Sequence, residues 1–252
     1  MIWLDRGRVR VPADWVQRVA RALPDRAAYD RAAREFERLG INSTKRRDGF
    51  KKFAPQVLKE GGGKRNFPSI WGDAKDALAG MSHQKCAYCE HPLNARRSGQ
   101  VEHFKPKSLF PSLAYDWDNY FLACGGCNGA KGDNWPKMGG YVRPDQGDPS
   151  KQLLFQTDGT VKAVRIASNA ERTIKDFDLN RSWLVRLRKR ALTDLLSRLE
   201  IVAQLHRSDK EAGLRLARNE FKRARDPENP YSSALRQCFL HGWRSALPGA
   251  RL

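Results

Sequence analysis

Four of the five cysteines form two pairs whose spacing suits a metal site. Cys86 and Cys89 make one Cys-x2-Cys pair, Cys124 and Cys127 make the other, and 34 residues lie between the pairs. Each pair can present two thiolates from a tight turn, and four thiolates complete the tetrahedral shell of zinc. A four-thiolate shell leaves no position for water, so the predicted zinc is structural. Cys238 is expected in the core of a C-terminal helix.

The segment around and between these pairs also carries side chains that suit phosphodiester hydrolysis. Glu102 and His103 are adjacent in an apolar stretch, and Asn128 directly follows the last cysteine of the second pair. Hydrolysis needs a base that activates water and a divalent cation that stabilises charge on the phosphate and the leaving oxygen. His103 is the candidate base because imidazole titrates near neutral pH. Glu102 and Asn128 offer the oxygen ligands that magnesium prefers.

The same residues also have ordinary structural interpretations. Adjacent strand residues point to opposite faces, so Glu102 and His103 share a site only at a strand end or a bulge. Asn128 could merely cap a helix, because it begins one in this prediction. Lys105, Lys107 and Lys131 are candidates for phosphate contacts, and each could equally be plain surface.

The charge of the 252-residue chain is strongly positive and unevenly distributed. It has 47 Lys and Arg against 28 Asp and Glu, a net charge of +19 and a sequence pI near 10.1. The net charge is +8 over residues 1–80 (18 minus 10), +1 over 81–150 (8 minus 7) and +10 over 151–252 (21 minus 11). Such an excess attracts nucleic acid, although basic side chains are also common on solvated helix faces. We therefore predict a central reactive module between two basic regions with these boundaries.

Helical periodicity dominates both flanks. Before the module it predicts helices over residues 11–23, 27–39, 50–58 and 70–79, with a loop at the glycines 61–63. The lysine after these glycines does not make a phosphate loop, because the leading glycine and the Ser or Thr are missing. After the module, residues 153–155 and 161–164 flank Asp158-Gly159 as a hairpin.

The C-terminal region is predicted as three helices. Asn180 is the expected N-cap of the first, whose apolar stripe comprises Leu184, Leu187, Ala191, Leu195, Leu199, Val202 and Leu205. The second follows Ser208, and the third covers residues 234–243. The fold class is therefore α+β and mainly helical. No stretch is long and apolar enough for a membrane span, and the N-terminus lacks a signal-peptide core, so we expect a cytoplasmic protein.

The order of these motifs is similar to that of the HNH endonucleases, whose active site is a ββα-metal finger. The resemblance implies that His103 is the general base and that Asn119 braces the loop between the two strands. It also implies that Glu102 and Asn128 hold Mg²⁺ or Mn²⁺ while the four paired cysteines hold Zn²⁺. Two positions depart from the name-giving pattern, with Asn128 in place of His and Glu102 in place of Asp. These departures put the preferred metal and the rate in doubt.

A narrower resemblance extends over Lys85-Cys86-Ala87-Tyr88-Cys89-Glu90 and residues 101–107, and more weakly to about residue 240. These segments look like the PtuB-like HNH proteins of Septu and retron anti-phage systems. That resemblance implies an ATPase partner of the ABC/SMC type (PtuA-like), or a retron reverse transcriptase with its RNA. The predicted target is nucleic acid, with DNA favoured over RNA. The alternatives are a zinc-stabilised nucleic-acid-binding protein that never cuts and a protein that docks an ATPase.

Overall fold

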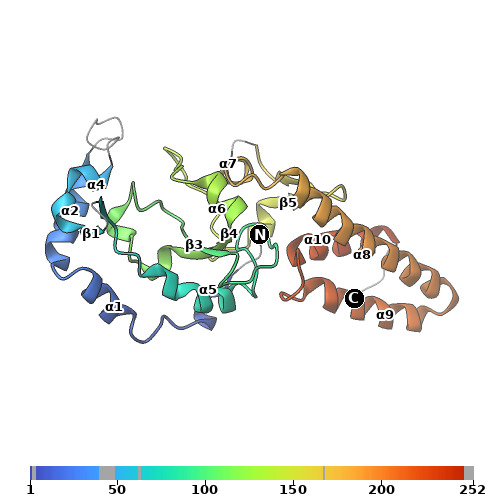
Figure 1. Cartoon of the computed structure of the whole chain (residues 1–252). Helices are drawn as coiled ribbons and strands as arrows, with labels where there is room; N and C mark the ends of the chain where they lie inside the picture. Colours follow the sequence, from blue (N-terminus) through green and yellow to red (C-terminus); the bar gives the residue numbers. More distant parts are fainter. Residues whose placement is uncertain (2–3, 40–48, 62–63, 167, 247–252) are drawn as a thin grey trace.

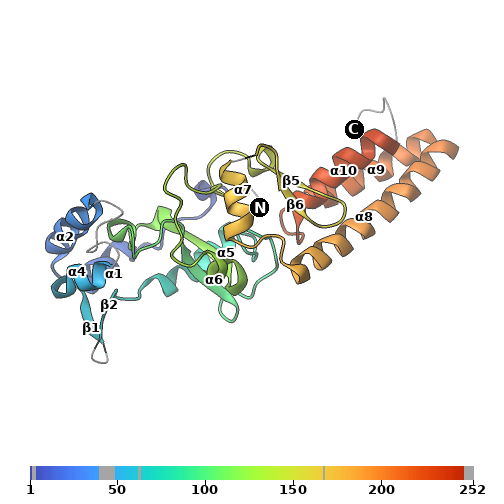
Figure 2. The ribbon, with the colours of Figure 1, turned by 90° about the horizontal axis from the view of Figure 1, so that it is seen from above.

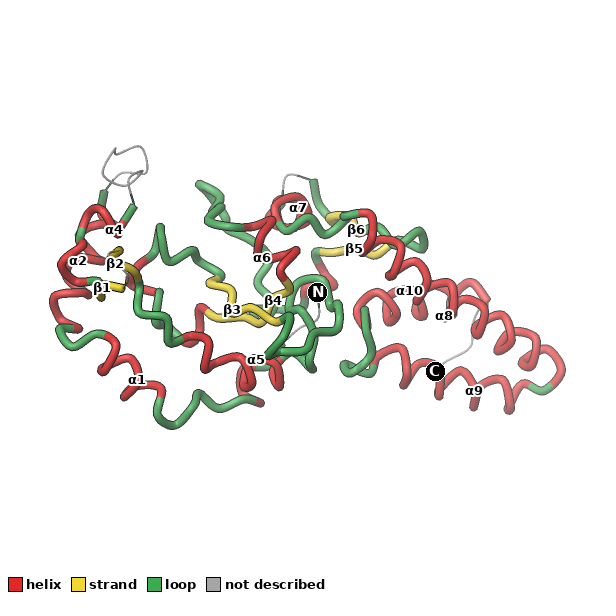
Figure 3. The backbone as a smooth tube through the Cα atoms, viewed as in Figure 1, coloured by secondary structure: helices red, strands yellow, loops and turns green. Residues whose placement is uncertain are grey.

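Helices lie at both ends of an elongated chain, and the short strands β3 and β4 lie between them (Figures 1 and 3). This computed structural model describes residues 1, 4–39, 49–61, 64–166 and 168–246. The view from above shows the same arrangement, with α2 and α8 on opposite sides of the centre (Figure 2). The buried apolar residues of the described chain nevertheless form one cluster, which runs from Met1 to Trp243.

The N-terminal region forms short helices and one hairpin. Its elements are a 3₁₀ turn at Arg6–Arg8, α1 (Trp15–Ala22), α2 (Arg26–Arg38), α4 (Phe50–Phe53), a 3₁₀ turn at Pro55–Val57, and the paired strands β1 (Lys59–Gly61) and β2 (Lys64–Asn66). A 3₁₀ turn at Trp71–Ala74 then leads into α5 (Lys75–Met81). Each of the four predicted helices therefore has a counterpart. The helix predicted over residues 50–58 is shorter, and the one predicted over residues 70–79 begins as a 3₁₀ turn.

Proline and glycine account for two differences. The predicted helix over residues 50–58 ends at Phe53, because Pro55 has no N–H for the helical ladder and restricts the residue before it. Around the predicted glycine loop the structure has a hairpin, in which Gly61 is the last residue of β1 and pairs with Lys64 of β2; Gly62 and Gly63 lie outside the described residues. In α1, Trp15 and Val19 are buried, whereas the side chain of Val16 is 78% exposed.

The centre of the molecule is a strand pair with a short helix. β3 (Gly99–His103) pairs antiparallel with β4 (Tyr120–Cys124), with Glu102 opposite Phe121 and His103 opposite Tyr120. The loop between them contains 3₁₀ turns at Pro111–Leu113 and Trp117–Asn119. α6 (Gly125–Lys131) follows β4 directly and contacts both strands. This order of two strands and a helix is the ββα arrangement expected from the sequence.

The predicted second hairpin is present as β5 (Leu153–Phe155) and β6 (Val161–Ala163), which follow a 3₁₀ turn at Pro149–Lys151. It is followed by α7 (Asn169–Asp176), a helix that the sequence analysis did not predict. Asn180 was expected to cap the next helix and does not. Its side chain instead accepts from Val161 N at 2.8 Å and donates to Val161 O at 2.9 Å, so it fastens this hairpin.

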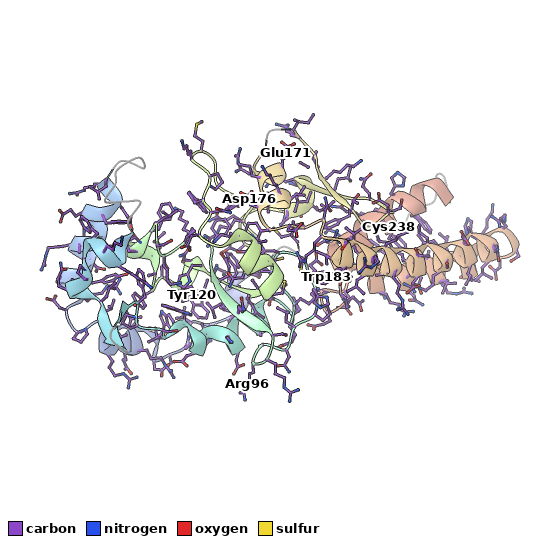
Figure 4. All side chains as sticks on the ribbon, turned by 45° about the horizontal axis from the view of Figure 1, so that its top comes forward. Arg96, Tyr120, Glu171, Asp176, Trp183 and Cys238 are labelled. Atoms are coloured by element: carbon purple, nitrogen blue, oxygen red, sulfur yellow. The ribbon has the colours of Figure 1, made fainter. Side chains whose placement is uncertain are left out.

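Three long helices form the C-terminal end. They are α8 (Ser182–Ser208), α9 (Lys210–Arg225) and α10 (Ser232–Ala246), which pack on one another. The predicted apolar stripe of α8 is buried at Leu184, Leu195, Leu199 and Val202, whereas Leu187 is 41% exposed. Cys238 is buried in α10, as predicted (Figure 4).

The prediction of a mainly helical α+β fold around an HNH-like module is confirmed by this element order. The domain boundaries at residues 80 and 150 stay a prediction. Contacts do cross the first boundary, because Leu4 N donates to Pro144 O at 2.8 Å. Among the described helices, none combines the length and the apolar character that a bilayer span requires.

Candidate active site

The four paired cysteines meet at one buried point. Their sulfur atoms all lie within 4.8 Å of one another, and Cys89 Sγ lies 3.8 Å from Cys124 Sγ. A tetrahedron with zinc–sulfur bonds of about 2.3 Å has edges of about 3.8 Å, so the cluster has the size that zinc needs. Hydrogen bonds from the thiols of Cys127, Cys86 and Cys89 hold the pKa of Cys124 well below its usual range, which favours the thiolate that a metal binds.

The sulfur cluster joins two parts of the chain that flank β3. The first pair of cysteines precedes β3, and the second pair spans the junction of β4 and α6. Cys124 is the N-cap of α6, and its sulfur accepts a hydrogen bond from Cys127 N at 3.4 Å. A metal at this point would therefore fix α6 against the strands.

Two of the predicted metal ligands lie between β3 and α6. Gln100 and Glu102 are two residues apart in β3, so their side chains lie on the same face of the strand. Asn128 and Lys131, three residues apart, share one face of α6. Asn128 Nδ2 donates to Gln100 Oε1 at 2.8 Å, and the Lys131 ammonium forms an ion pair with Glu102 Oε1. The face of β3 that carries Gln100 and Glu102 therefore packs against the face of α6 that carries Asn128 and Lys131.

The Glu102 carboxylate is buried between a lysine and a tyrosine. Its side chain is 1% exposed, as is that of Lys131. Tyr88, which lies between the first two cysteines, donates its hydroxyl to Glu102 Oε2. Glu102 Oε1 forms the ion pair with Lys131 but has no well-aligned hydrogen bond, so a divalent ion at this oxygen would have to displace the Lys131 ammonium. The carboxylate of Glu102 and the amide oxygen of Asn128 are donors of the kind that a hard divalent ion prefers.

His103 lies on the other face of β3, at the last residue of the strand. Its imidazole makes edge contacts with Trp71 and Tyr120, with ring centroids 4.9 Å and 5.0 Å away. The ladder is regular through His103, so no bulge brings the imidazole round to Glu102. Of the two arrangements considered for Glu102 and His103, a strand end and a bulge, the structure has the strand end, with the proposed base on one face of β3 and the proposed ligands on the other. They flank the strand end from two sides because of the strict alternation of the strand.

A backbone carbonyl fixes the protonation of the His103 ring. His103 Nε2 lies 3.1 Å from Ala114 O, and a carbonyl only accepts, so Nε2 carries the proton and Nδ1 has the lone pair. The side chain is 7% exposed. Burial, together with the positive charges of Lys107 and Lys131, lowers the pKa of His103 to about 3, against the opposing effect of the Ala114 hydrogen bond. The ring is therefore neutral at physiological pH.

Asn119 spans the loop between β3 and β4. Its side chain, 2% exposed, accepts from Lys105 N at 2.8 Å and donates to Lys105 O at 2.9 Å and to Leu113 O at 3.0 Å. These three bonds close the loop from inside, next to the residue that pairs with His103. This is the geometry that a bracing residue needs.

The three lysines proposed for phosphate contacts occupy different environments. Lys105 lies over the rings of Phe110 and Trp135, at 5.5 Å and 5.9 Å. Lys107 lies 5.0 Å over the ring of Trp71, and burial lowers its pKa. Lys131 is buried, and its ammonium donates to His103 O at 2.8 Å in addition to its pairing with Glu102. The phosphate role of all three stays a prediction.

Sequence reasoning missed Trp71 and Tyr88. Trp71 comes from the N-terminal region and covers the His103 ring, a contact between residues far apart in sequence that periodicity does not reveal. Tyr88 could have been suspected, because a tyrosine between two metal-binding cysteines is positioned by them. In Figure 4 the labelled Tyr120 marks this side of the site, in the middle of the molecule.

Comparison with known proteins gives a family match for the central region. The family model described as HNH endonuclease matches residues 86–134. Two curated relatives are both Septu protein PtuB. The one from Bacillus thuringiensis is 38% identical over 92 residues, which is 35% of this chain and 36% of the relative. The one from Bacillus mycoides (strain KBAB4) is 26% identical over 159 residues, 51% of this chain and 54% of the relative. The chain thus covers about half or less of these relatives.

Proposed function

We propose that this chain, which contains an HNH domain at residues 86–134 and is similar to PtuB proteins, is a divalent-metal-dependent endonuclease. It hydrolyses phosphodiester bonds in nucleic acid, most readily DNA. The observation that carries the proposal is the arrangement at the end of β3. Glu102 and Asn128 lie on the side of α6, and the neutral His103 ring lies on the opposite side.

The placement of the base and the metal ligands on opposite faces of β3 suits the reaction, because hydrolysis of a phosphodiester is an in-line displacement. The attacking water and the departing 3′ oxygen must lie on opposite sides of the phosphorus. A phosphate at the strand end would have the base on one side and the ligands on the other. A divalent ion held by Glu102 and Asn128 would supply charge stabilisation at the departing oxygen. Water attack with loss of the 3′ oxygen leaves a 5′ phosphate.

His103 acts as the base through Nδ1. The Ala114 carbonyl holds the Nε2 proton, so only Nδ1 can take the proton of the attacking water. In the unliganded site burial and two lysines keep the ring neutral, which leaves it in the reactive form. A phosphate bound next to the ring adds negative charge, which raises the pKa of the imidazole toward the value that proton transfer requires. The Ala114 hydrogen bond then stabilises the imidazolium.

The positive charge of the flanking regions supports binding that does not depend on sequence. The regions 1–80 and 151–252 carry +8 and +10. Contacts of Lys and Arg with phosphates fix register and orientation but read no bases. Cleavage is therefore expected at many sites and should weaken steeply with salt.

The similarity to Septu proteins supports a role in anti-phage defence with an ATPase partner of the ABC/SMC type. The structural Zn²⁺, the catalytic Mg²⁺ or Mn²⁺ and the cytoplasmic location belong to the same proposal. A retron reverse transcriptase as partner stays a prediction.

The test is cleavage of supercoiled plasmid with Mg²⁺ or Mn²⁺, with and without chelator, by the chain alone and with the ATPase partner. His103→Ala should abolish nicking while DNA binding and zinc content stay unchanged. His206→Ala is the matched control, since His206 lies near the far end of α8, where a ring nitrogen is 3.1 Å from Lys210 O. DNA binding without cleavage under all these conditions would instead support the non-catalytic alternative.

A further inference from the structure

The guanidinium of Arg181 lies against the sulfur cluster. Its nitrogen Nη2 is 3.5 Å from the sulfur atoms of Cys89, Cys124 and Cys127, and Nη1 is also 3.5 Å from Cys127. These are hydrogen-bond distances for sulfur as acceptor. Arg181 belongs to the C-terminal region and is the N-cap residue of α8. A side chain from outside the HNH domain therefore contacts three of the four candidate metal ligands.

The turn before α8 holds this guanidinium in place. Arg181 Nη1 also donates to Asp178 O at 2.8 Å and to Phe177 O at 3.4 Å, just beyond the end of α7. Asp178 has a left-handed backbone with φ of 47°, which turns the chain toward the cysteines. On its other side the guanidinium lies 4.6 Å from the ring of Trp183, the residue labelled in Figure 4 where α8 meets the central region.

Both cysteine pairs accommodate this contact. In the second pair, a Cβ at Gly126 would lie 3.2 Å from Nε and 3.3 Å from Cζ of Arg181, so glycine leaves room for the guanidinium. Beside the first pair, the ring of His91 packs edge-on against Trp183, with centroids 5.1 Å apart. Residues next to both cysteine pairs therefore support the position of Arg181 and its neighbour Trp183.

Charge explains why an arginine suits this position. Four thiolates and one Zn²⁺ carry a net charge of −2, and a buried charge needs a compensating partner. Hydrogen bonds from outer groups to metal ligands typically change metal affinity by about 10- to 100-fold. An arginine donates several bonds from one rigid plane, so one side chain can serve three sulfurs at once, which a lysine ammonium does less well.

We infer that Arg181 is the outer-shell counter-charge of the four-cysteine zinc site, and that through it zinc anchors the start of α8 to the HNH domain. This inference rests on the proposed zinc site and is independent of nuclease activity. It makes the C-terminal helices part of the zinc site. On loss of zinc the four thiolates would take up protons, so the negative charge that holds Arg181 would disappear and the start of α8 would be freed.

The first test measures zinc release from the full-length protein into excess chelator, with a colorimetric zinc indicator. Arg181→Gln should release zinc about tenfold faster or more than wild type, with Arg181→Lys between the two. The matched control is Arg186→Gln, an exposed arginine one turn further along α8. Should Arg181→Gln fail to fold, Gly126→Ala gives the second test. Its methyl group displaces the guanidinium without removing a charge, and it should also accelerate release.

The second test follows amide hydrogen exchange at residues 184–186, whose N–H groups are the first in α8 to be hydrogen-bonded; those of Leu184 and Val185 donate to Arg181 O. In zinc-loaded wild type these amides should be protected, and removal of zinc should reduce their protection. Zinc-loaded Arg181→Gln should resemble the zinc-free wild type there. Release at the wild-type rate by the variants, or unchanged protection, would overturn the role of Arg181. Purified protein that neither contains nor takes up zinc would overturn the metal assignment itself, whatever its effect on cleavage.

Discussion

The hydroxyl of Tyr88 donates a hydrogen bond to the carboxylate of Glu102, although the two residues serve different predicted metal sites. Tyr88 lies between two cysteines of the four-cysteine cluster, and Glu102 is a proposed ligand of the catalytic ion. The Tyr88 ring is buried and packs on Phe177 with centroids 4.3 Å apart, so the hydroxyl cannot move away easily. Tyr88 therefore orients one oxygen of the Glu102 carboxylate, while Lys131 pairs with the other.

This relationship predicts that Tyr88→Phe weakens the catalytic metal site and leaves zinc binding intact. The substitution removes one hydrogen bond to a ligand carboxylate, an outer-shell change that should lower Mn²⁺ affinity by about tenfold. Mn²⁺ binding can be measured by electron paramagnetic resonance, and zinc by elemental analysis. Tyr29→Phe is the control, because its buried hydroxyl donates to Pro111 O at 2.7 Å and not to Glu102. Equal Mn²⁺ affinity in wild type and Tyr88→Phe would contradict the role assigned to the hydroxyl.

Local patterns predicted the parts of this molecule that depend on nearby residues. The spacing of the cysteines predicted their cluster, and the Asp158-Gly159 signal predicted the hairpin. The prediction failed at Asn180, where a local capping rule competed with a hydrogen-bond partner far along the chain. Asn180 has the side chain of a helix cap, but the backbone of Val161 takes both of its hydrogen bonds.

The positions of the site residues required the folded chain. Alternation along β3 showed that Glu102 and His103 point apart, yet only the structure shows what covers each face. Trp71, which contacts the imidazole, lies 32 residues before His103 in the sequence (103 minus 71). Arg181 reaches the sulfur cluster from the C-terminal region. Neither contact leaves a periodic signal, because each depends on how separate elements pack.

The depressed pKa of His103 predicts a shifted pH dependence. The free imidazole titrates near 6.5 and the buried one near 3, so the native protein stays unprotonated where the unfolded chain binds a proton. Stability should therefore fall as the pH drops from about 6.5 to about 3. Lys107→Gln removes one of the charges that lower this pKa, and the NMR titration of His103 should move toward neutral pH. A wild-type titration near 6.5 would contradict the environment described for the ring.

Asn119 is predicted to stabilise the loop between the active-site strands. Asn119→Ala removes three buried hydrogen bonds and leaves Lys105 N, Lys105 O and Leu113 O without these partners, which should cost about 3 kcal/mol of unfolding free energy. Urea denaturation measures this loss. Asn134→Ala, at an exposed position three residues after Lys131, should leave stability nearly unchanged. A similar small effect for both variants would show that the loop does not depend on Asn119.

Lys131 is predicted to be required for the stability of the fold, because its ion-pair partner Glu102 is buried. Lys131→Met leaves the charge of Glu102 without its ion pair in a site that is 1% exposed, and removal of one partner from a buried pair typically costs about 3–5 kcal/mol. Adding Glu102→Gln removes that uncompensated charge, so the double variant should recover most of the lost stability. Denaturant unfolding of the wild type, both single variants and the double variant measures the coupling. If the two losses simply add, Lys131 and Glu102 do not act as a pair.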